Sequence, residues 1–356
     1  MLDELHKSRE YAEQIRFAGD IARDHDIETS TDDGAHSFFS QNDLQISETV
    51  TPDLAACLNR VYERLHIPAE AVSAFVYASP EMQAACFATG HQRCVIRFSS
   101  GLIDILNIEE IEFVAGHELG HFLLRHVGGC HNQESQESLQ YYIHQRAKEI
   151  SVDRIGLVAC QSLNIALRAL MKTVSGLNDK YMRFDVATFI DQLRQTKDIG
   201  SGIDATSSHP SIIVRCRALM WFSLNDFFSR GEEYYSYEQI SKMDSHIQKD
   251  LDKYIDGPAN ACIELEKTHL TLWLVAQEIV RDGKFQKREQ ECINDFFGQE
   301  LLDKLKNFLA GLNASEVADE VQNRIETTRT DLESLIPDSF EKEYEKILAQ
   351  VPTILK

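Results

Sequence analysis

Residues 115–124 read Ala-Gly-His-Glu-Leu-Gly-His-Phe-Leu-Leu, and this stretch predicts a helix that carries a metal site. Asn107, followed by Glu110, forms a capping-box pattern that predicts where the helix begins. His117 and His121 are four residues apart, so both imidazoles lie on one helical face and can bind one Zn²⁺. Glu118 follows the first histidine and lies beside the metal, where it can act as a general base toward water.

The same His-Glu-x-x-His pattern also occurs by chance on ordinary amphipathic helices, where the histidines are simply polar residues. Here apolar side chains flank the motif, including Phe113, Val114 and Phe122, which predicts that the histidines are partly buried. Paired buried imidazoles need a partner, because burying an unsatisfied polar group costs free energy. A metal ion satisfies both rings, so a metal site is the favoured interpretation.

A catalytic zinc site needs a third protein ligand and a coordination position that stays open to water. Leu124 and Val127 stand where the metzincin pattern requires Gly and His, which excludes that pattern. Helical extrapolation places His126 on the opposite face of the motif helix. His131 and His144 stay open as ligands, but no pattern supports them.

A second predicted helix offers a carboxylate as the third ligand. Glu149 and Asp153 lie one turn apart in Glu-Ile-Ser-Val-Asp, on one face of a helix that could pack across the first. Glu149 would bind the metal, and Asp153 would accept a hydrogen bond from the outer ring nitrogen of a ligand histidine. The alternative is a solvated acidic face near Lys148 and Arg154.

Composition and charge exclude several classes of partner. The 356-residue chain has a formal net charge of −21 and no block of Lys and Arg, so we expect no binding to nucleic acid or to anionic membrane surfaces. The N-terminus lacks the pattern of a secretory signal, and no uncharged apolar stretch approaches the roughly 20 residues of a spanning helix. We therefore expect a soluble, cytoplasmic protein without membrane insertion, whose eight cysteines are mostly buried, reduced thiols.

The remaining patterns predict an α+β, mostly helical fold. Short runs at 74–77 and 94–98 predict strands of a small sheet, with 85–88 as a further candidate, and a helix is expected from Pro52. From residue 101 to the C-terminus the chain reads as helix and turn.

Three segments follow from these patterns: an N-terminal helix and polar connector over 1–49, an α+β domain over 50–230 and an all-α accessory domain over 231–356. The corner at Asp282-Gly283 resembles the turn between helices in TerB-like, tellurite-resistance-type domains. A helix that simply ends at a glycine is the alternative. An EF-hand is not favoured, because acidic residues are missing from the alternate positions.

Taken together, residues from about 50 to 220 resemble the zinc peptidases typified by the HtpX heat-shock protease and the CAAX prenyl endopeptidase. Besides the metal motif, the matching elements are Ala85-Cys86-Phe87-Ala88-Thr89-Gly90, residues 100–106, Arg125-His126, residues 149–153, and Ser208-His209-Pro210 followed by Arg215. Two positions depart from the family, because Ala85 replaces a strand Asn and Val152 replaces a small Ala.

The resemblance implies a gluzincin-type zinc metallopeptidase domain over 50–230, with one Zn²⁺ per chain held by His117, His121 and Glu149. It implies that Glu118 is the general base. It further implies that His209 points into the cleft to stabilise the oxyanion, and that Arg215 supports the residues behind the metal ligands.

The predicted function is hydrolysis of peptide bonds in protein or peptide substrates. We expect the substrate main chain to pair with the strand around residues 93–98. The accessory domain would bind a protein partner or regulate the peptidase. The alternative is a zinc-stabilised, non-catalytic peptidase fold that serves as a scaffold. Glu118 argues against it, because a structural zinc site is closed by a fourth protein ligand and needs no general base.

Overall fold

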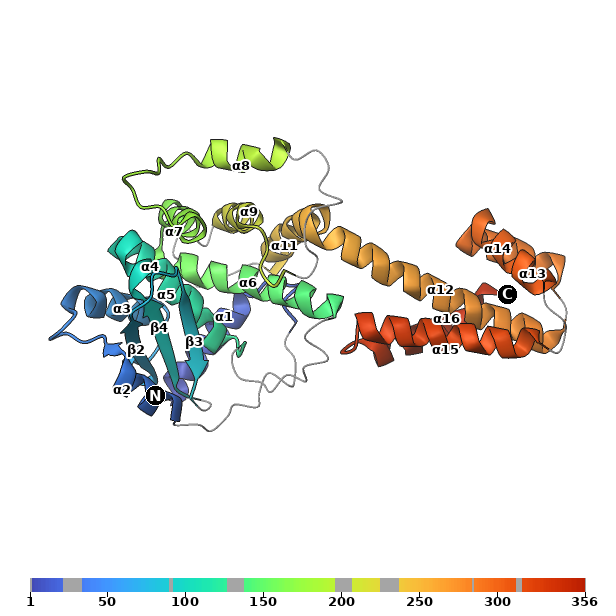
Figure 1. Ribbon diagram of the computed structural model, residues 1–356, viewed down its shortest axis with the longest axis horizontal. Coiled ribbons are helices and arrows are strands. Elements are labelled where there is room, and N and C mark those ends of the chain that lie inside the picture. Colours follow the sequence, from blue (N-terminus) through green and yellow to red (C-terminus); the bar gives the residue numbers. More distant parts are fainter. Residues whose placement is uncertain are drawn as a thin grey trace. The chain divides into compact units, whose positions relative to one another are not determined.

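The computed structural model describes residues 2–21, 34–89, 92–126, 138–195, 207–224, 237–283, 285–311 and 316–355. The chain divides into two compact units (Figure 1). The first contains Met1–His131 and Ile143–Ile255, and the second contains Asn132–Tyr142 and Asp256–Lys356. The N-terminal segment thus belongs to the same unit as the metal motif, and the second unit begins later than residue 231. Residues 225–236, which include that expected boundary, lie outside the described residues.

The first unit contains a four-stranded sheet in the order β1-β2-β4-β3. Its strands are β1 (Leu44–Gln45), β2 (Val72–Tyr77), β3 (Ala84–Ala88) and β4 (Cys94–Ser99). Strand β2 runs parallel to β4, whereas the other two pairs are antiparallel. The three expected strands are therefore confirmed, and β1 is a short addition at one edge.

Strand β4 lies inside the sheet, and this position corrects one expectation. Ile96 pairs with Ala74 of β2 on one side and with Cys86 of β3 on the other. Both sides of β4 are occupied, so the prediction that a substrate main chain pairs with residues 93–98 is wrong. The strand at the sheet edge next to the motif helix is β3, which packs against that helix.

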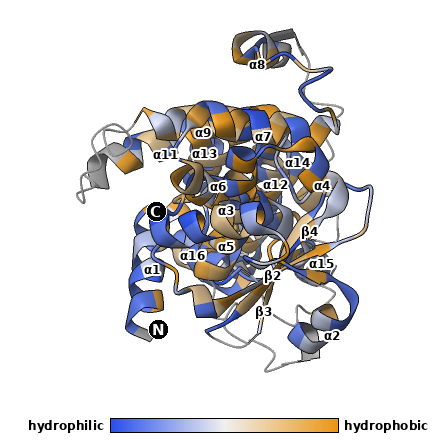
Figure 2. Ribbon diagram, turned by 90° about the vertical axis from the view of Figure 1, so that its left-hand side faces the viewer, coloured by the Kyte–Doolittle hydropathy of each residue, from blue (hydrophilic) through white to orange (hydrophobic). Residues whose placement is uncertain are grey.

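Helices surround the sheet and build most of the first unit (Figure 1). Their bounds are α1 (Leu2–Gln14), α2 (Gly34–Asn42), α3 (Pro52–Arg64), α4 (Ser100–Ile105), α5 (Ile108–Leu123), α6 (Leu139–Cys160), α7 (Leu163–Ser175), α8 (Val186–Gln195), α9 (Ile212–Ser223) and α11 (Tyr237–Leu251). The described residues also include two short helical turns, at Ala69–Ala71 and Asp252–Asp256. Helix α1 is mostly hydrophilic (Figure 2) and buries one face through Leu5, Ser8 and Ala12.

Helix α5 carries the metal motif, and its first turn is fixed by the predicted capping box. The Asn107 side chain accepts a hydrogen bond from the backbone of Glu110 at 2.8 Å, and Glu110 accepts one from the Asn107 backbone at 2.9 Å. The same buried Glu110 carboxylate pairs with Lys172 of α7 at 2.7 Å. Glu112 pairs with Arg64 of α3 at 2.6 Å. Because a buried carboxylate needs such partners, these contacts fix α5 against two neighbouring helices.

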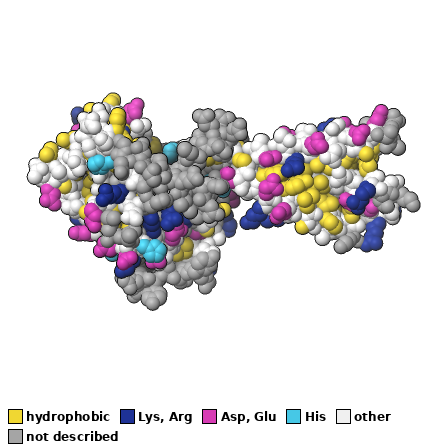
Figure 3. Space-filling model, turned by 90° about the horizontal axis from the view of Figure 1, so that it is seen from below, with side chains coloured by type: hydrophobic (Ala, Val, Ile, Leu, Met, Phe, Trp, Pro, Cys, Tyr) yellow, Lys and Arg dark blue, Asp and Glu magenta, His cyan; other side chains and the backbone are white. Residues whose placement is uncertain are grey.

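The second unit consists of helices in its described part: α12 (Gly257–Asp282), α13 (Lys287–Phe297), α14 (Gln299–Ala310), α15 (Val317–Leu335) and α16 (Phe340–Ile354). Helix α12 ends at Gly283 in the left-handed conformation, with φ of +71°. This left-handed glycine ends the helix, and it is compatible with both interpretations of the corner at Asp282-Gly283. Figure 3 shows hydrophobic side chains gathered on one face of this unit.

None of the described helices combines the length and the apolar character that crossing a membrane requires. The cysteines that the structure describes are free thiols, and five of them are buried. Cys130 lies outside the described residues.

Candidate metal centre

Helices α5 and α6 approach each other closely because glycines line their interface. A Cβ atom added to Gly116 would lie 2.3 Å from the Ala159 Cβ atom, and one added to Gly156 would lie 2.8 Å from the Phe113 carbonyl oxygen. At Gly120 the added atom would lie 3.1 Å from Val152. Val152, where the resembled family has a smaller Ala, is accommodated by the missing side chain of Gly120. This close contact lets the Glu149 side chain of α6 reach the two histidines of α5.

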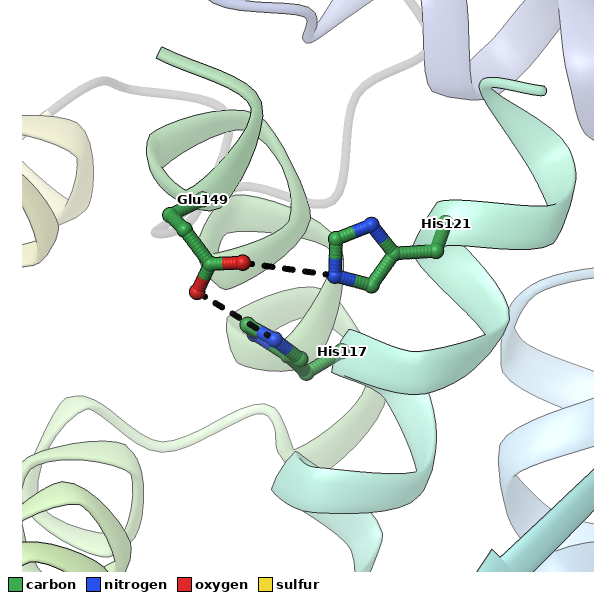
Figure 4. Close-up of side chains that lie close together, drawn as sticks. All are labelled: His117, His121 and Glu149. Carbon is green, nitrogen blue, oxygen red and sulfur yellow. Dashed lines mark ion pairs between the residues drawn. The ribbon is translucent and has the colours of Figure 1, made fainter. Parts of the chain in front are cut away.

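The three predicted ligand residues meet at this interface (Figure 4). One ligand atom from each of His117, His121 and Glu149 lies within 4.8 Å of the other two. The Nε2 atom of His117 lies 3.6 Å from Oε2 of Glu149, and the Nε2 atom of His121 lies 3.5 Å from Oε1. All three side chains are at least four-fifths buried. The Oε2 atom of Glu149 is buried without a hydrogen-bond partner.

Behind His117 lies an acidic residue that is itself held by an arginine. The Nδ1 atom of His117 lies 3.0 Å from Oδ1 of Asp153. Arg215 donates two hydrogen bonds to the Asp153 carboxylate, from Nε at 2.8 Å and from Nη2 at 2.6 Å. An ionised Asp153 accepts a hydrogen bond from the Nδ1–H group, so that Nε2 of His117 presents its lone pair to the space near Glu149.

A second chain of contacts lies behind His121, and the sequence did not predict it. The Nδ1 atom of His121 lies 3.2 Å from Nδ1 of His126, whose Nε2 atom lies 3.1 Å from Oδ2 of Asp20. Helix α5 ends at Leu123, and Arg125 has a positive φ of 59°. The helical extrapolation for His126 therefore fails, because the chain turns back and brings the ring beside His121. The His126 ring lies next to His121 and is not one of the three clustered residues.

Charges around the cluster keep its carboxylates ionised. Burial alone would raise the pKa of Glu149, but Arg215 and His117 hold it well below its usual range. Burial likewise opposes ionisation of Asp153, and Arg215 outweighs it and lowers that pKa. The pKa of His126 is lowered to about 4 by burial, which outweighs the opposite effect of Asp20. At neutral pH the site therefore combines anionic carboxylates with a neutral His126 ring.

Three further predicted site residues lie on or beside this arrangement. The Nδ1 atom of His209 lies 3.3 Å from Oε2 of Glu149, and the His209 side chain is 65% exposed. The Nη1 atom of Arg215 lies 3.4 Å from the same oxygen. Glu118 is half-buried on α5, and it forms no hydrogen bond or ion pair with any residue that the structure describes. His131, one of the alternative ligands, lies outside the described residues.

The donor atoms fit a zinc ion. Two imidazole nitrogens and one carboxylate oxygen are the ligand set of a catalytic zinc site with three protein ligands and an open position. The buried Oε2 atom of Glu149 has His209 and Arg215 nearby but accepts no hydrogen bond of regular geometry, so it stays available to a metal ion. No further His, Cys, Asp or Glu joins the cluster within the described segments, so one coordination position would stay open.

Comparisons with known proteins agree with this chemistry. Residues 48–143 match peptidase family M48, a span that includes the His-Glu-x-x-His motif and ends before Glu149. The chain is 25% identical over 232 residues to the plastoglobule-localized metallopeptidase 48 of Arabidopsis thaliana, a chloroplastic protein. That similarity covers 57% of this chain and 64% of the relative's length. No solved structure matches the chain significantly. The similarities support a peptidase of the metallopeptidase type.

Proposed function

We propose that the first unit is a zinc-dependent metalloendopeptidase that hydrolyses peptide bonds in protein or peptide substrates. The observation that carries this proposal is the cluster of His117, His121 and Glu149, in which each imidazole has a partner behind it and the Glu149 carboxylate is buried between both rings. A solvated acidic face would not bury these groups together. We also place the chain with the HtpX and CAAX endopeptidases, on the sequence elements that it shares with them.

Glu118 is the proposed general base. When bound, Zn²⁺ supplies a Lewis acid that polarises the scissile carbonyl and lowers the pKa of water. Glu118 then takes a proton from the attacking water and delivers it to the leaving amine. Its carboxylate is suited to this task because no described residue occupies it with a hydrogen bond or an ion pair.

His209 and Arg215 have different proposed roles. The His209 ring is exposed and contacts Glu149, so it can also reach a substrate beside the cluster and donate a hydrogen bond to the developing oxyanion. Arg215 is mostly buried and holds Asp153, so it acts on the orientation of His117 and not on the substrate.

Strand β3 is the proposed place for the substrate main chain. It is the edge strand beside α5, and an extended peptide can add to such an edge through main-chain hydrogen bonds. Ala85, which replaces the Asn of the resembled family, provides no polar side chain there. We therefore expect binding that depends little on sequence.

We further propose that the second unit binds a protein partner, with a fold similar to TerB-like domains. Its large apolar side chains Leu265, Phe296 and Leu348 are exposed, and such residues are common in binding surfaces when they form a patch. All the residues proposed for zinc binding and catalysis belong to the first unit. The second unit would thus select substrates or partners and leave the chemistry to the first.

The test of the proposed function separates metal binding from catalysis. The purified chain should contain about one Zn²⁺ and cleave casein or a quenched-fluorescence peptide library. Glu118→Gln should keep the metal and lower kcat/KM by roughly 10²–10⁴-fold, because only the general base is lost.

Glu109→Gln provides the matched control, since Glu109 is an exposed glutamate on the same helix. It should change neither metal content nor cleavage. A Glu118→Gln chain that cleaves as fast as the wild type would remove the proposed mechanism. A wild type that binds zinc and cleaves no peptide or protein would favour the non-catalytic scaffold.

A further inference from the structure

The N-terminal segment after α1 is anchored inside the first unit by buried polar groups. Arg154 of α6 donates a hydrogen bond from Nη1 to the Ile15 carbonyl oxygen at 3.0 Å. The backbone N–H of Phe17 donates to the Ser151 hydroxyl at 3.1 Å. The Phe17 side chain is 1% exposed. This segment is therefore part of the packed core and not a detached extension.

Asp20 stands at the end of this anchored segment and is fully buried. Its Oδ1 atom accepts a hydrogen bond from Nη2 of Arg16 at 3.0 Å, and its Oδ2 atom lies 3.1 Å from Nε2 of His126. The exposed fraction of the side chain is 0% for Asp20 and 1% for His126. Because the carboxylate is buried, water cannot replace either partner, and both contacts persist in the folded protein.

The hydrogen-bond roles along this chain follow from the Asp20 end. An ionised carboxylate can only accept, so Nε2 of His126 carries the proton that it donates to Asp20. The Nδ1 atom of a neutral His126 is then an acceptor, and it must receive its hydrogen bond from Nδ1 of His121. With its proton on Nδ1, His121 has an unprotonated Nε2 atom, which is the atom that faces Glu149.

We propose that Asp20 is a positioning residue of the metal centre, acting through His126 to fix the orientation and tautomer of His121. This inference rests on the metal-binding part of the proposed function. It gives each ligand histidine a carboxylate behind it: Asp153 contacts His117 directly, whereas Asp20 acts on His121 through one intervening imidazole. A partner behind a metal-bound histidine typically contributes 10- to 100-fold to metal affinity.

The experiment measures Zn²⁺ affinity in the full chain by competition with a chromophoric chelator. Asp20→Ala and His126→Phe should each weaken Zn²⁺ binding by roughly 10- to 100-fold. The double variant should bind Zn²⁺ no more weakly than His126→Phe, because Asp20 acts only through His126. In Asp20→Asn the single amide oxygen would accept from Arg16, which turns the NH₂ group toward Nε2 of His126, so this variant should also lose affinity.

Glu13→Ala is the matched control, because Glu13 is the other acidic partner of Arg16, at 3.1 Å, and its side chain is half-exposed. It should leave Zn²⁺ affinity unchanged. A second readout is the nitrogen NMR spectrum of the histidines in the metal-free protein, in which His121 should be protonated at Nδ1. Asp20→Ala should make that ring a mixture of tautomers, which a general loss of stability would not do.

Two results would overturn the inference and leave the proposed function standing. One is wild-type Zn²⁺ affinity in Asp20→Ala, and the other is a full additional loss when Asp20→Ala is added to His126→Phe. A wild type that binds Zn²⁺ but cleaves nothing would instead remove the peptidase proposal, while the relay from Asp20 to His121 would still be judged by affinity. A wild type that binds no Zn²⁺ would remove both.

Discussion

The Asp153 carboxylate contacts two side chains of the site, because it accepts hydrogen bonds from Arg215 and lies 3.0 Å from Nδ1 of His117. We predict that Asp153→Asn weakens Zn²⁺ affinity by roughly 10- to 100-fold, because an amide can turn its NH₂ group toward His117 and no longer fixes the tautomer of the ring. Both Asp153 and Arg215 stay outside the ligand set, so the variant should still bind about one Zn²⁺ at saturation. Competition with a chelator measures the change.

A matched control separates this effect from the loss of an ion pair. Arg217 donates two hydrogen bonds to Asp250, both at 2.9 Å, in the same bidentate geometry but away from the cluster. Asp250→Asn should therefore change the unfolding temperature and leave Zn²⁺ affinity as it was. Equal Zn²⁺ affinities for Asp153→Asn and the wild type would show that Asp153 does not contribute to metal binding.

Single residues of the site differ in how far the sequence could predict them. His117, His121 and Glu149 follow from spacing on two helices and from family resemblance, and the structure brings them together. Asp20 could not be predicted, because its contact with His126 joins residues that are 106 positions apart and no local pattern marks such a contact. The prediction that His126 lies on the opposite face of the motif helix was wrong, because it extrapolated the helix past its actual end at Leu123.

The contact between α5 and α6 determines whether His117, His121 and Glu149 can meet. We predict that Gly120→Ala lowers the free energy of unfolding by about 1–3 kcal/mol, since its new Cβ atom would lie 3.1 Å from Val152. Val152→Ala in the same chain should recover part of this loss by removing the Cγ1 methyl group, one of the two Val152 atoms that the new atom would meet at 3.1 Å. Denaturant unfolding of the two single variants and the double variant gives the coupling free energy.

The prediction is tested by the sign of the coupling free energy between Gly120→Ala and Val152→Ala. The double variant should be more stable than the sum of the single losses requires, by an amount within about 0.5–3 kcal/mol. Additive losses would mean that the helices shift apart instead of clashing. Zn²⁺ affinity should then fall in Gly120→Ala, because Glu149 would move away from both histidines.

Whole elements were predictable where their signals are local. The start of α5 is such a case, because its capping box involves neighbours in the sequence, Asn107 and Glu110. The strand order was not predictable in this way. The apolar run of β4 is compatible with a strand inside a sheet or at its edge, and only the pairing with β2 and β3 decides between these positions. The expected substrate strand was wrong for that reason.

The division of the chain into units depends on contacts that composition does not report. The expected boundary at residue 231 followed an acidic, tyrosine-rich stretch. In the structure α11 still belongs to the first unit, and its Asp244 accepts hydrogen bonds from Arg154 of α6 and, at 3.0 Å, from the backbone N–H of Ala18. Asp244 thus supports the segment that ends at Asp20, so the first unit needs residues beyond 231.

Two truncated chains distinguish these boundaries. Residues 1–255 should fold and bind Zn²⁺ with nearly wild-type affinity, because they keep every residue of the cluster together with Asp244. Residues 1–230 lose Asp244 and leave the fully buried Arg154 without its carboxylate, which should cost about 3–5 kcal/mol of stability. Thermal unfolding and chelator competition on both chains give the comparison.

The full chain offers a matched point variant for the same test. Asp244→Leu should reproduce most of the loss of stability that distinguishes residues 1–230 from residues 1–255, and Asp250→Asn on the same helix should not.

The first turn of α6 is grouped with the second unit, where Gln140 donates a hydrogen bond to Ser339 at 2.7 Å, so residues 1–255 should fray there. Glu149 lies about two turns beyond Tyr142, the last α6 residue grouped with the second unit, so we expect it to stay outside that fraying. A chain of residues 1–255 that is insoluble or binds no Zn²⁺ would show that the helices after Asp256 belong to the peptidase core.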